Sequence, residues 1–123
     1  MKDMNIAVYH GDPAIAKNIA VTLRNHFRAI HVVTSIDDLK MAIAKHKAGL
    51  TVLDIESDEL QTVRSLHQEF PHVAIVCTHR LADENMWMAV LDAGADDICQ
   101  PGDVAGLLAF ARRSDRLART AAA

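Results

Sequence analysis

The segment LTVLDIE, residues 50–56, runs from apolar residues into a carboxylate, Asp54, and the chain becomes polar from Glu56 onward. A short apolar run bounded by polar residues predicts a strand that is buried on both faces. In open α/β sheets, ligands bind beyond the carboxyl ends of the strands. Asp54 is therefore the first candidate for a functional residue.

Apolar runs and helix-like stripes alternate on both sides of this segment. We expect strands at 5–9, 29–33, 50–54, 73–77 and 97–100. We expect helices from 13, from 36 to about 47 with an end at Gly49, from about 59 to 70, from 83 to 93, and from 104. This alternation predicts one parallel sheet with five helices on its two faces. One domain covers residues 1–119, and residues 120–123 are an unstructured tail or the start of a linker.

Composition limits the function classes. Of 123 residues, half are hydrophobic and 24% are charged, so the chain can bury a core. A net charge of −3 gives no general attraction to nucleic acid or to an anionic membrane. No apolar run approaches the roughly 20 residues of a membrane helix, and we see no secretory signal. Cys77 and Cys99 fall in expected core strands, which indicates buried thiols in a reducing cytoplasm.

Polar side chains follow most of the expected strands. In a parallel sheet these residues gather at one edge, namely His10, Gly11, Asp12, Asp54, Thr78, His79 and Gln100. A carboxylate, a hydroxyl and an amide at one edge would suit a phosphoryl group or a metal ion. Polar residues at strand ends are also common where no site exists, so both interpretations stay open.

Three short segments resemble one known family. They are VLDI at 52–55, IVCT at 75–78 and AGADD at 93–97. In order and spacing they are similar to the receiver domains of two-component response regulators. The resemblance implies a flavodoxin-like (CheY-like) sheet of order 2-1-3-4-5 and a protein that is not an enzyme. It also implies that Asp54 is the phospho-acceptor and Thr78 the switch hydroxyl.

The family's phosphorylation site is degenerate in this chain. The resemblance places His10 and Gly11 where the family has an acidic pair, and Gln100 where it has a lysine. Asp12 lies one position further on, so Asp12 and Asp54 are the remaining candidates for Mg²⁺ ligands. We expect no cofactor unless Asp54 is phosphorylated, and Mg²⁺ only in that case.

The resulting functional hypothesis is a signal-transduction domain that works through protein–protein contact, with a histidine kinase or a downstream signalling protein as partner. A first alternative is a working, Mg²⁺-dependent phospho-acceptor at Asp54. A second is a small flavodoxin-like enzyme or ligand-binding domain. The sequence has no glycine-rich phosphate loop and no nucleophile–base pair by spacing, which argues against this second alternative.

Two hypotheses address what replaces the acidic pair. In the first, His10 or Arg80 forms an ion pair with Asp54, and a protonated His10 makes that pair sensitive to pH. In the second, His10, Asp54 and His79 hold a transition metal, because imidazole and carboxylate suit such ions.

The expected fourth helix contains the nearly apolar segment NMWMAVL, residues 85–91. We expect Trp87, Met88 and Leu91 to face the sheet and Met86 and Val90 to point outward as an interaction face. The resemblance adds dimerisation through the fourth helix, fifth strand and fifth helix. The alternative is that one large helix face is simply buried.

The last helix carries four arginines, Arg112, Arg113, Arg116 and Arg119. They could contact nucleic acid or an acidic partner, or form a solvated face with one pair to Asp115 or Asp103. No helix-turn-helix pattern follows, so we predict no DNA-binding module in this chain.

Overall fold

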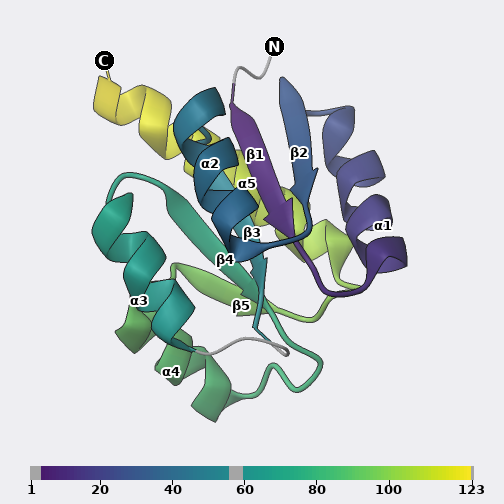
Figure 1. The fold of residues 1–123 in the computed structure, drawn as a ribbon, viewed down its shortest axis with the longest axis vertical. Coiled ribbons are helices and arrows are strands. Elements are labelled where there is room, and N and C mark those ends of the chain that lie inside the picture. The colour runs from purple at the N-terminus through teal and green to yellow at the C-terminus, as the bar shows by residue number, and fades with distance from the viewer. Residues whose placement is uncertain (1–3, 56–59, 123) are drawn as a thin grey trace.

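The computed structural model describes the backbone of residues 4–55 and 60–122 and the side chains as far as residue 114. Within these ranges five strands and five helices alternate (Figure 1). Their bounds are β1 (Asn5–Tyr9), α1 (Pro13–Arg24), β2 (Ala29–Val33), α2 (Ile36–His46), β3 (Leu50–Asp54), α3 (Leu60–Glu69), β4 (Ala74–Thr78), α4 (Glu84–Ala93), β5 (Asp97–Cys99) and α5 (Val104–Ala122).

The strands form one parallel sheet in the order β2-β1-β3-β4-β5, as expected. β3 lies at the centre, and all five of its residues are buried. β2 and β5 are the edge strands of the sheet. The run around Asp54 is therefore apolar because helices cover both of its faces.

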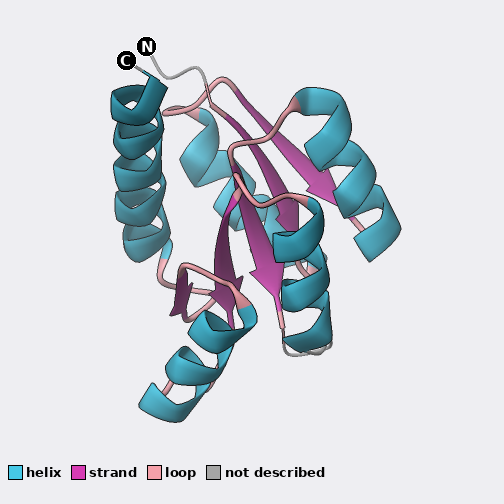
Figure 2. Ribbon diagram, turned by 90° about the vertical axis from the view of Figure 1, so that its left-hand side faces the viewer, coloured by secondary structure: helices cyan, strands magenta, loops and turns pink. Residues whose placement is uncertain are grey.

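Two hydrophobic cores lie on opposite faces of the sheet (Figures 1 and 2). Side chains of α1 and α5 pack on one face, and those of α2, α3 and α4 pack on the other. Successive residues of β1 alternate between the two cores, with Ile6 and Val8 in one and Ala7 in the other. This alternation is the two-residue period of a strand.

Three of the helices start where short polar side chains predict a cap. Asp12 caps α1 and is followed by Pro13 in the first turn. Ser35 caps α2 and Asp83 caps α4, each by accepting a backbone N–H of the first turn. These contacts satisfy N–H groups that have no partner inside the helix, which is why the starts could be predicted locally.

The end of α2 differs from the prediction. The helix ends at His46, and Lys47 takes the left-handed conformation with φ of 51°. Gly49 lies beyond the cap and begins the approach to β3. An added Cβ at Gly49 would come within 2.9 Å of the Met4 side chain, so this glycine serves close packing rather than helix termination.

Two strands also end at residues other than those predicted. β4 runs from Ala74 to Thr78, so Thr78 is a strand residue rather than the start of a loop. β5 ends at Cys99, which leaves Gln100 outside the sheet. The predicted first residue of the third helix, Glu59, lies outside the described residues.

The tail prediction is wrong as far as Ala122, because α5 continues through residues 120–122. That a linker begins in this region stays a prediction.

Neither α5 nor any other described helix is long and apolar enough to cross a membrane. On α5, Arg113 Nη2 lies 4.0 Å from Asp97 Oδ2 of β5, an ion pair that the sequence analysis did not predict. The predicted pair with Asp115 or Asp103 stays a prediction, because the side chain of Asp115 lies outside the described part. The side chains of Arg116 and Arg119 lie outside the described part.

The orientation predicted for α4 is wrong. Val90 is fully buried, and Met86 packs partly against the same core. Trp87 and Met88, which were expected to face the sheet, are 44% and 55% exposed. The helix is apolar all round, so the sequence pattern could not define which stripe turns inward. Met86 and Val90 are therefore not an outward interaction face.

The AGADD segment has a clear structural role. Gly94, with φ of 112°, ends α4 in a conformation that favours glycine. Asp96 then makes two hydrogen bonds to Ile75 of β4. The Asp96 N–H donates to the Ile75 carbonyl at 2.8 Å, and Asp96 Oδ2 accepts the Ile75 N–H at 2.8 Å. These bonds anchor the start of β5 beside β4.

Candidate functional site

The carboxyl edge of the sheet holds three buried polar side chains. Asp54 ends β3 and is 3% exposed, and Thr78 ends β4 directly opposite it in the strand register. His10 is the first residue after β1 and is 8% exposed. The structure thus brings together three of the residues that the sequence placed at this edge.

Asp54 is engaged by the segment after β1. The Gly11 N–H donates to Asp54 Oδ2 at 3.2 Å. The same oxygen lies 3.9 Å from His10 Nδ1. At positions where the resemblance implies carboxylates, this chain therefore offers an imidazole and a backbone N–H, and the N–H is a donor that suits a carboxylate anion.

The contact between His10 and Asp54 forms, but the arrangement is not that of an ion pair. His10 Nδ1 accepts the Asp12 N–H at 3.0 Å. A nitrogen that accepts a hydrogen bond carries no proton, so this geometry corresponds to a neutral imidazole with its hydrogen on Nε2.

Two polar atoms at this edge are buried without a hydrogen-bond partner among the described residues: His10 Nε2 and Thr78 Oγ1. The other buried threonine, Thr51, donates its hydroxyl to the Ala7 carbonyl at 3.0 Å. A buried polar group without a partner costs on the order of 1–3 kcal/mol. The Thr78 hydroxyl is therefore a group that a new acceptor beside Asp54 would satisfy.

The remaining candidates at this edge make contacts elsewhere. Asp12 Oδ1 accepts the Ala14 N–H in the first turn of α1, at 2.9 Å. His79 Nδ1 accepts the Leu81 N–H at 2.9 Å. Gln100 is exposed, and its Nε2 donates to the Arg80 carbonyl at 3.3 Å. None of these described contacts is directed at Asp54.

The residues present do not fit a metal site. In the described part of the chain, no three His, Cys, Asp or Glu side chains are placed to hold a metal ion, so the His10–Asp54–His79 site is not assembled. Mg²⁺ prefers carboxylate and other hard oxygen ligands. Here an imidazole and a glycine replace two of the expected ligands, and Asp12 is used as a helix cap.

The two cysteines offer no reactive thiol. Both are free, and Cys77 is fully buried. Burial raises the pKa of Cys77 to about 12, and burial also raises the pKa of Cys99 to about 12. Because the thiolate is the nucleophile, these groups are unsuited to covalent chemistry near neutral pH.

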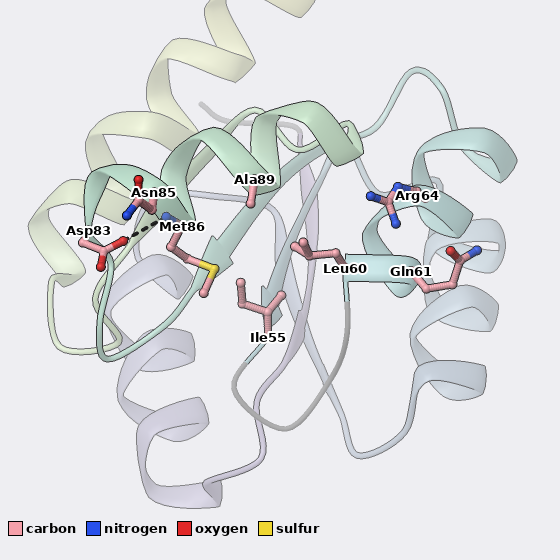
Figure 3. A pocket seen from close by; sticks show the side chains of 8 residues that line it. All are labelled: Ile55, Leu60, Gln61, Arg64, Asp83, Asn85, Met86 and Ala89. Carbon is pink, nitrogen blue, oxygen red and sulfur yellow. Dashed lines mark hydrogen bonds between the residues drawn. The ribbon is translucent and has the colours of Figure 1, made fainter.

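A cavity of about 670 Å³ opens between α3 and α4, beginning at the residue that follows Asp54 (Figure 3). Its apolar side chains are Ile55, Leu60, Met86 and Ala89. Its polar side chains include Arg64 and Asp83, and Asp83 Oδ1 accepts the Met86 N–H at 2.9 Å. The sequence analysis missed this cavity, because it depends on the spacing between two helices. The described lining residues carry one charge of each sign, Arg64 and Asp83, and so indicate no preferred ligand charge.

Solved structures resemble this chain over most of its length. The BeF3-activated N-terminal receiver domain of RstA from Klebsiella pneumoniae is 28% identical, with a TM-score of 0.79, over 91% of this chain and 98% of that one. The receiver domain of Francisella response regulator 1452 is 15% identical, with a TM-score of 0.83, over 94% and 99%. NtrX from Brucella abortus, in complex with ADP, is 20% identical, with a TM-score of 0.84, over 98% of this chain and 28% of that one.

No sequence-family profile matches the chain, and no curated protein sequence does. The structural comparisons nevertheless define the class: the chain has the receiver fold of two-component response regulators. The resemblance seen in its three sequence segments is confirmed. Within that class, its particular feature is an Asp54 surrounded by His10, Gly11 and Thr78.

Proposed function

We propose that this chain is a receiver-type signalling domain that acts through protein contact without ordinary Mg²⁺-dependent phosphorylation of Asp54. Its partner is a histidine kinase or a downstream signalling protein in the cytoplasm. The observation that carries the proposal is the buried Asp54 carboxylate, which accepts the Gly11 N–H and faces the His10 imidazole. In this chain the Gly11 N–H and the His10 imidazole stand where the family has acidic, metal-binding residues.

The electrostatics support this proposal. Phosphoryl transfer is accelerated mainly by positioned positive charge on the transferred group. In this chain the position expected to hold a lysine is Gln100, whose side-chain amide is neutral and donates to the Arg80 carbonyl. Asp54 would have to accept a phosphoryl group with neither a metal-binding acidic pair nor that lysine.

The test is intact mass spectrometry of the full chain after incubation with acetyl phosphate and Mg²⁺. Asp54→Asn is the matched control, and the RstA receiver domain under the same conditions is a positive control. We expect no gain of a phosphoryl mass in wild type, while its amide NMR spectrum shows a folded domain. A gain that disappears in Asp54→Asn would overturn the proposal.

One observation favours the alternative of a working phospho-acceptor. The Thr78 hydroxyl is buried beside Asp54 and has no hydrogen-bond partner in the described residues. A phosphoryl oxygen on Asp54 would provide an acceptor for it. Under this alternative, Thr78→Ala would still gain the phosphoryl mass but would lose the accompanying changes in the amide spectrum.

The partner surface that we propose lies on α4 and the turn before it. Leu81, Trp87 and Met88 are 71%, 44% and 55% exposed. Large exposed apolar side chains, with an aromatic ring and a flexible thioether among them, are typical of protein-binding surfaces. This surface replaces Met86 and Val90 as the contact face, for a partner protein or for a second copy of the chain.

A further inference from the structure

A groove of about 620 Å³ lies between α1 and the edge strand β2, away from the cavity between α3 and α4. Side chains of α1 form one wall, the end of β2 forms the other, and His10 and Gly11 lie at the end nearest Asp54. The α1 residues that line it run from Pro13 to Arg24, about 16 Å at the rise of an α-helix. Its volume falls in the range of small-molecule sites.

The walls of this groove are mainly apolar. Two buried alanines of α1, Ala16 and Ala20, leave room between the helix and the strand. Val21 on the helix and Val32 on the strand are 49% and 45% exposed. Because β2 is the last strand of the sheet, no further strand covers this side. Such a groove favours a ligand with an apolar body.

The charges of the groove have one sign. Lys17 and Arg24 line it, and their spacing of seven residues places them on the same side of α1. Neither forms an ion pair or side-chain hydrogen bond with another described residue. The described lining contains no Asp or Glu, and adjacent Asp12 directs Oδ1 to the N-terminus of α1. Lys17 and Arg24, which have no ion pair among the described residues, lie beside an apolar groove in a chain of net charge −3 and favour an anionic ligand.

We propose that the α1–β2 groove binds a small amphipathic carboxylate, with its apolar body between Val21 and Val32 and its acid group on Lys17 and Arg24. A peptide added as a strand would pair along β2, whereas the groove touches only the last two residues of that strand and Thr34. A second copy that docked through the same groove would bring the like-charged Lys17 and Arg24 of two chains together.

His10 connects this groove to the sheet edge. It lines the groove, and its Nδ1 lies 3.9 Å from Asp54 Oδ2. A bound ligand therefore alters the surroundings of His10, and the ring signals of His10 report binding. The proposal does not depend on whether Asp54 is phosphorylated, because Asp54 is not among the residues that line the groove.

The experiment is a two-dimensional amide NMR titration of the full chain with sodium octanoate. 1-Octanol supplies the same apolar body without the charge, and acetate supplies the charge without the body. We expect saturable shifts at Ala20, Val21, Val32 and Val33 with octanoate, and much weaker ones with either control. Lys17→Gln with Arg24→Gln should weaken octanoate binding about tenfold or more, because charge-assisted contacts are lost.

Arg28→Gln with Lys45→Gln is the matched control, since both residues are exposed and neither lines the groove. This pair should bind octanoate as wild type does. Val21→Glu is a second test, because it places a carboxylate on an exposed position of the wall and should abolish binding. Equal binding of 1-octanol, unchanged affinity in the Lys17/Arg24 variant, or shifts confined to the α3–α4 cavity would each overturn the proposal.

Discussion

His10 determines the chemistry of the sheet edge at the scale of single residues. Its Nδ1 accepts the Asp12 N–H and faces Asp54, so one imidazole contacts both the cap of α1 and the candidate phospho-acceptor. Sequence spacing placed His10 near Asp54, because both lie at the carboxyl ends of neighbouring parallel strands. The hydrogen bond that Nδ1 accepts comes from a backbone N–H two residues later, which no spacing rule specifies.

A stacked pair of histidines joins β2 and α2. His31 of β2 and His46 of α2 stack with ring centroids 3.7 Å apart and planes 7° from parallel. The pKa of His31 is lowered by burial first, and then by the nearby charges of His46 and Lys45. A histidine whose folded pKa is depressed binds fewer protons than in the unfolded chain. Its contribution to stability is therefore complete above the unfolded pKa of about 6.5, and it is lost as the pH falls from there through the lower folded pKa.

We predict that the free energy of unfolding falls between pH 7.5 and pH 5.5, and that His46→Gln reduces this fall. The substitution removes the neighbouring ring charge but leaves His31 in place. Urea unfolding at each pH measures the effect, with His72→Gln as the control because His72 is exposed and outside the stack. The same pH dependence in His46→Gln and wild type would show that the stack does not contribute.

At the scale of elements, two helix ends use the left-handed conformation with different residues. Gly94 ends α4 with φ of 112°, and an added Cβ would lie 2.6 Å from His67 Cγ. Lys47 ends α2 with φ of 51°, although a side chain is disfavoured there. The sequence predicted the first end correctly, and it predicted the second two residues too late because Gly49 was the nearest glycine.

Lys47→Gly should therefore raise the free energy of unfolding by about 0.5 kcal/mol, after the greater flexibility of glycine in the unfolded chain is subtracted. Gly94→Ala should lower it by more than about 1 kcal/mol. Chemical denaturation measures both changes. Lys47→Ala is the control, since it removes the same side chain but keeps the strain. If Lys47→Gly were no more stable than Lys47→Ala, strain at this cap would be absent.

At the scale of the whole molecule, the two faces of α4 have different roles. Val90 is part of the core shared with β3 and β4, whereas Trp87 and Met88 lie on the surface that we propose for partner contact. The sequence analysis assigned these roles the other way round. A helix that is apolar all round carries no pattern to orient it, and only packing against the sheet decides.

Val90→Ala should lower the free energy of unfolding by about 2 kcal/mol, because it leaves a cavity in the core. Trp87→Ser with Met88→Ser should change it by less than about 0.5 kcal/mol while it weakens partner binding or self-association. Denaturation and analytical ultracentrifugation measure the two effects. A large loss of stability in the Trp87/Met88 variant would place these side chains in the core and would contradict the orientation of α4.

The sequence by itself determined the order and class of the elements, the parallel sheet and the position of Asp54. Those features depend on local signals: apolar runs of strand length, the caps Asp12, Ser35 and Asp83, and the AGADD segment. The tertiary structure alone decided which stripe of α4 is buried, the backbone donor that engages Asp54, and the burial of a Thr78 hydroxyl that has no hydrogen-bond partner among the described residues. It also decided the groove beside Lys17 and Arg24. Each of these depends on the distance between residues far apart in the chain, which close packing sets and which no local pattern encodes.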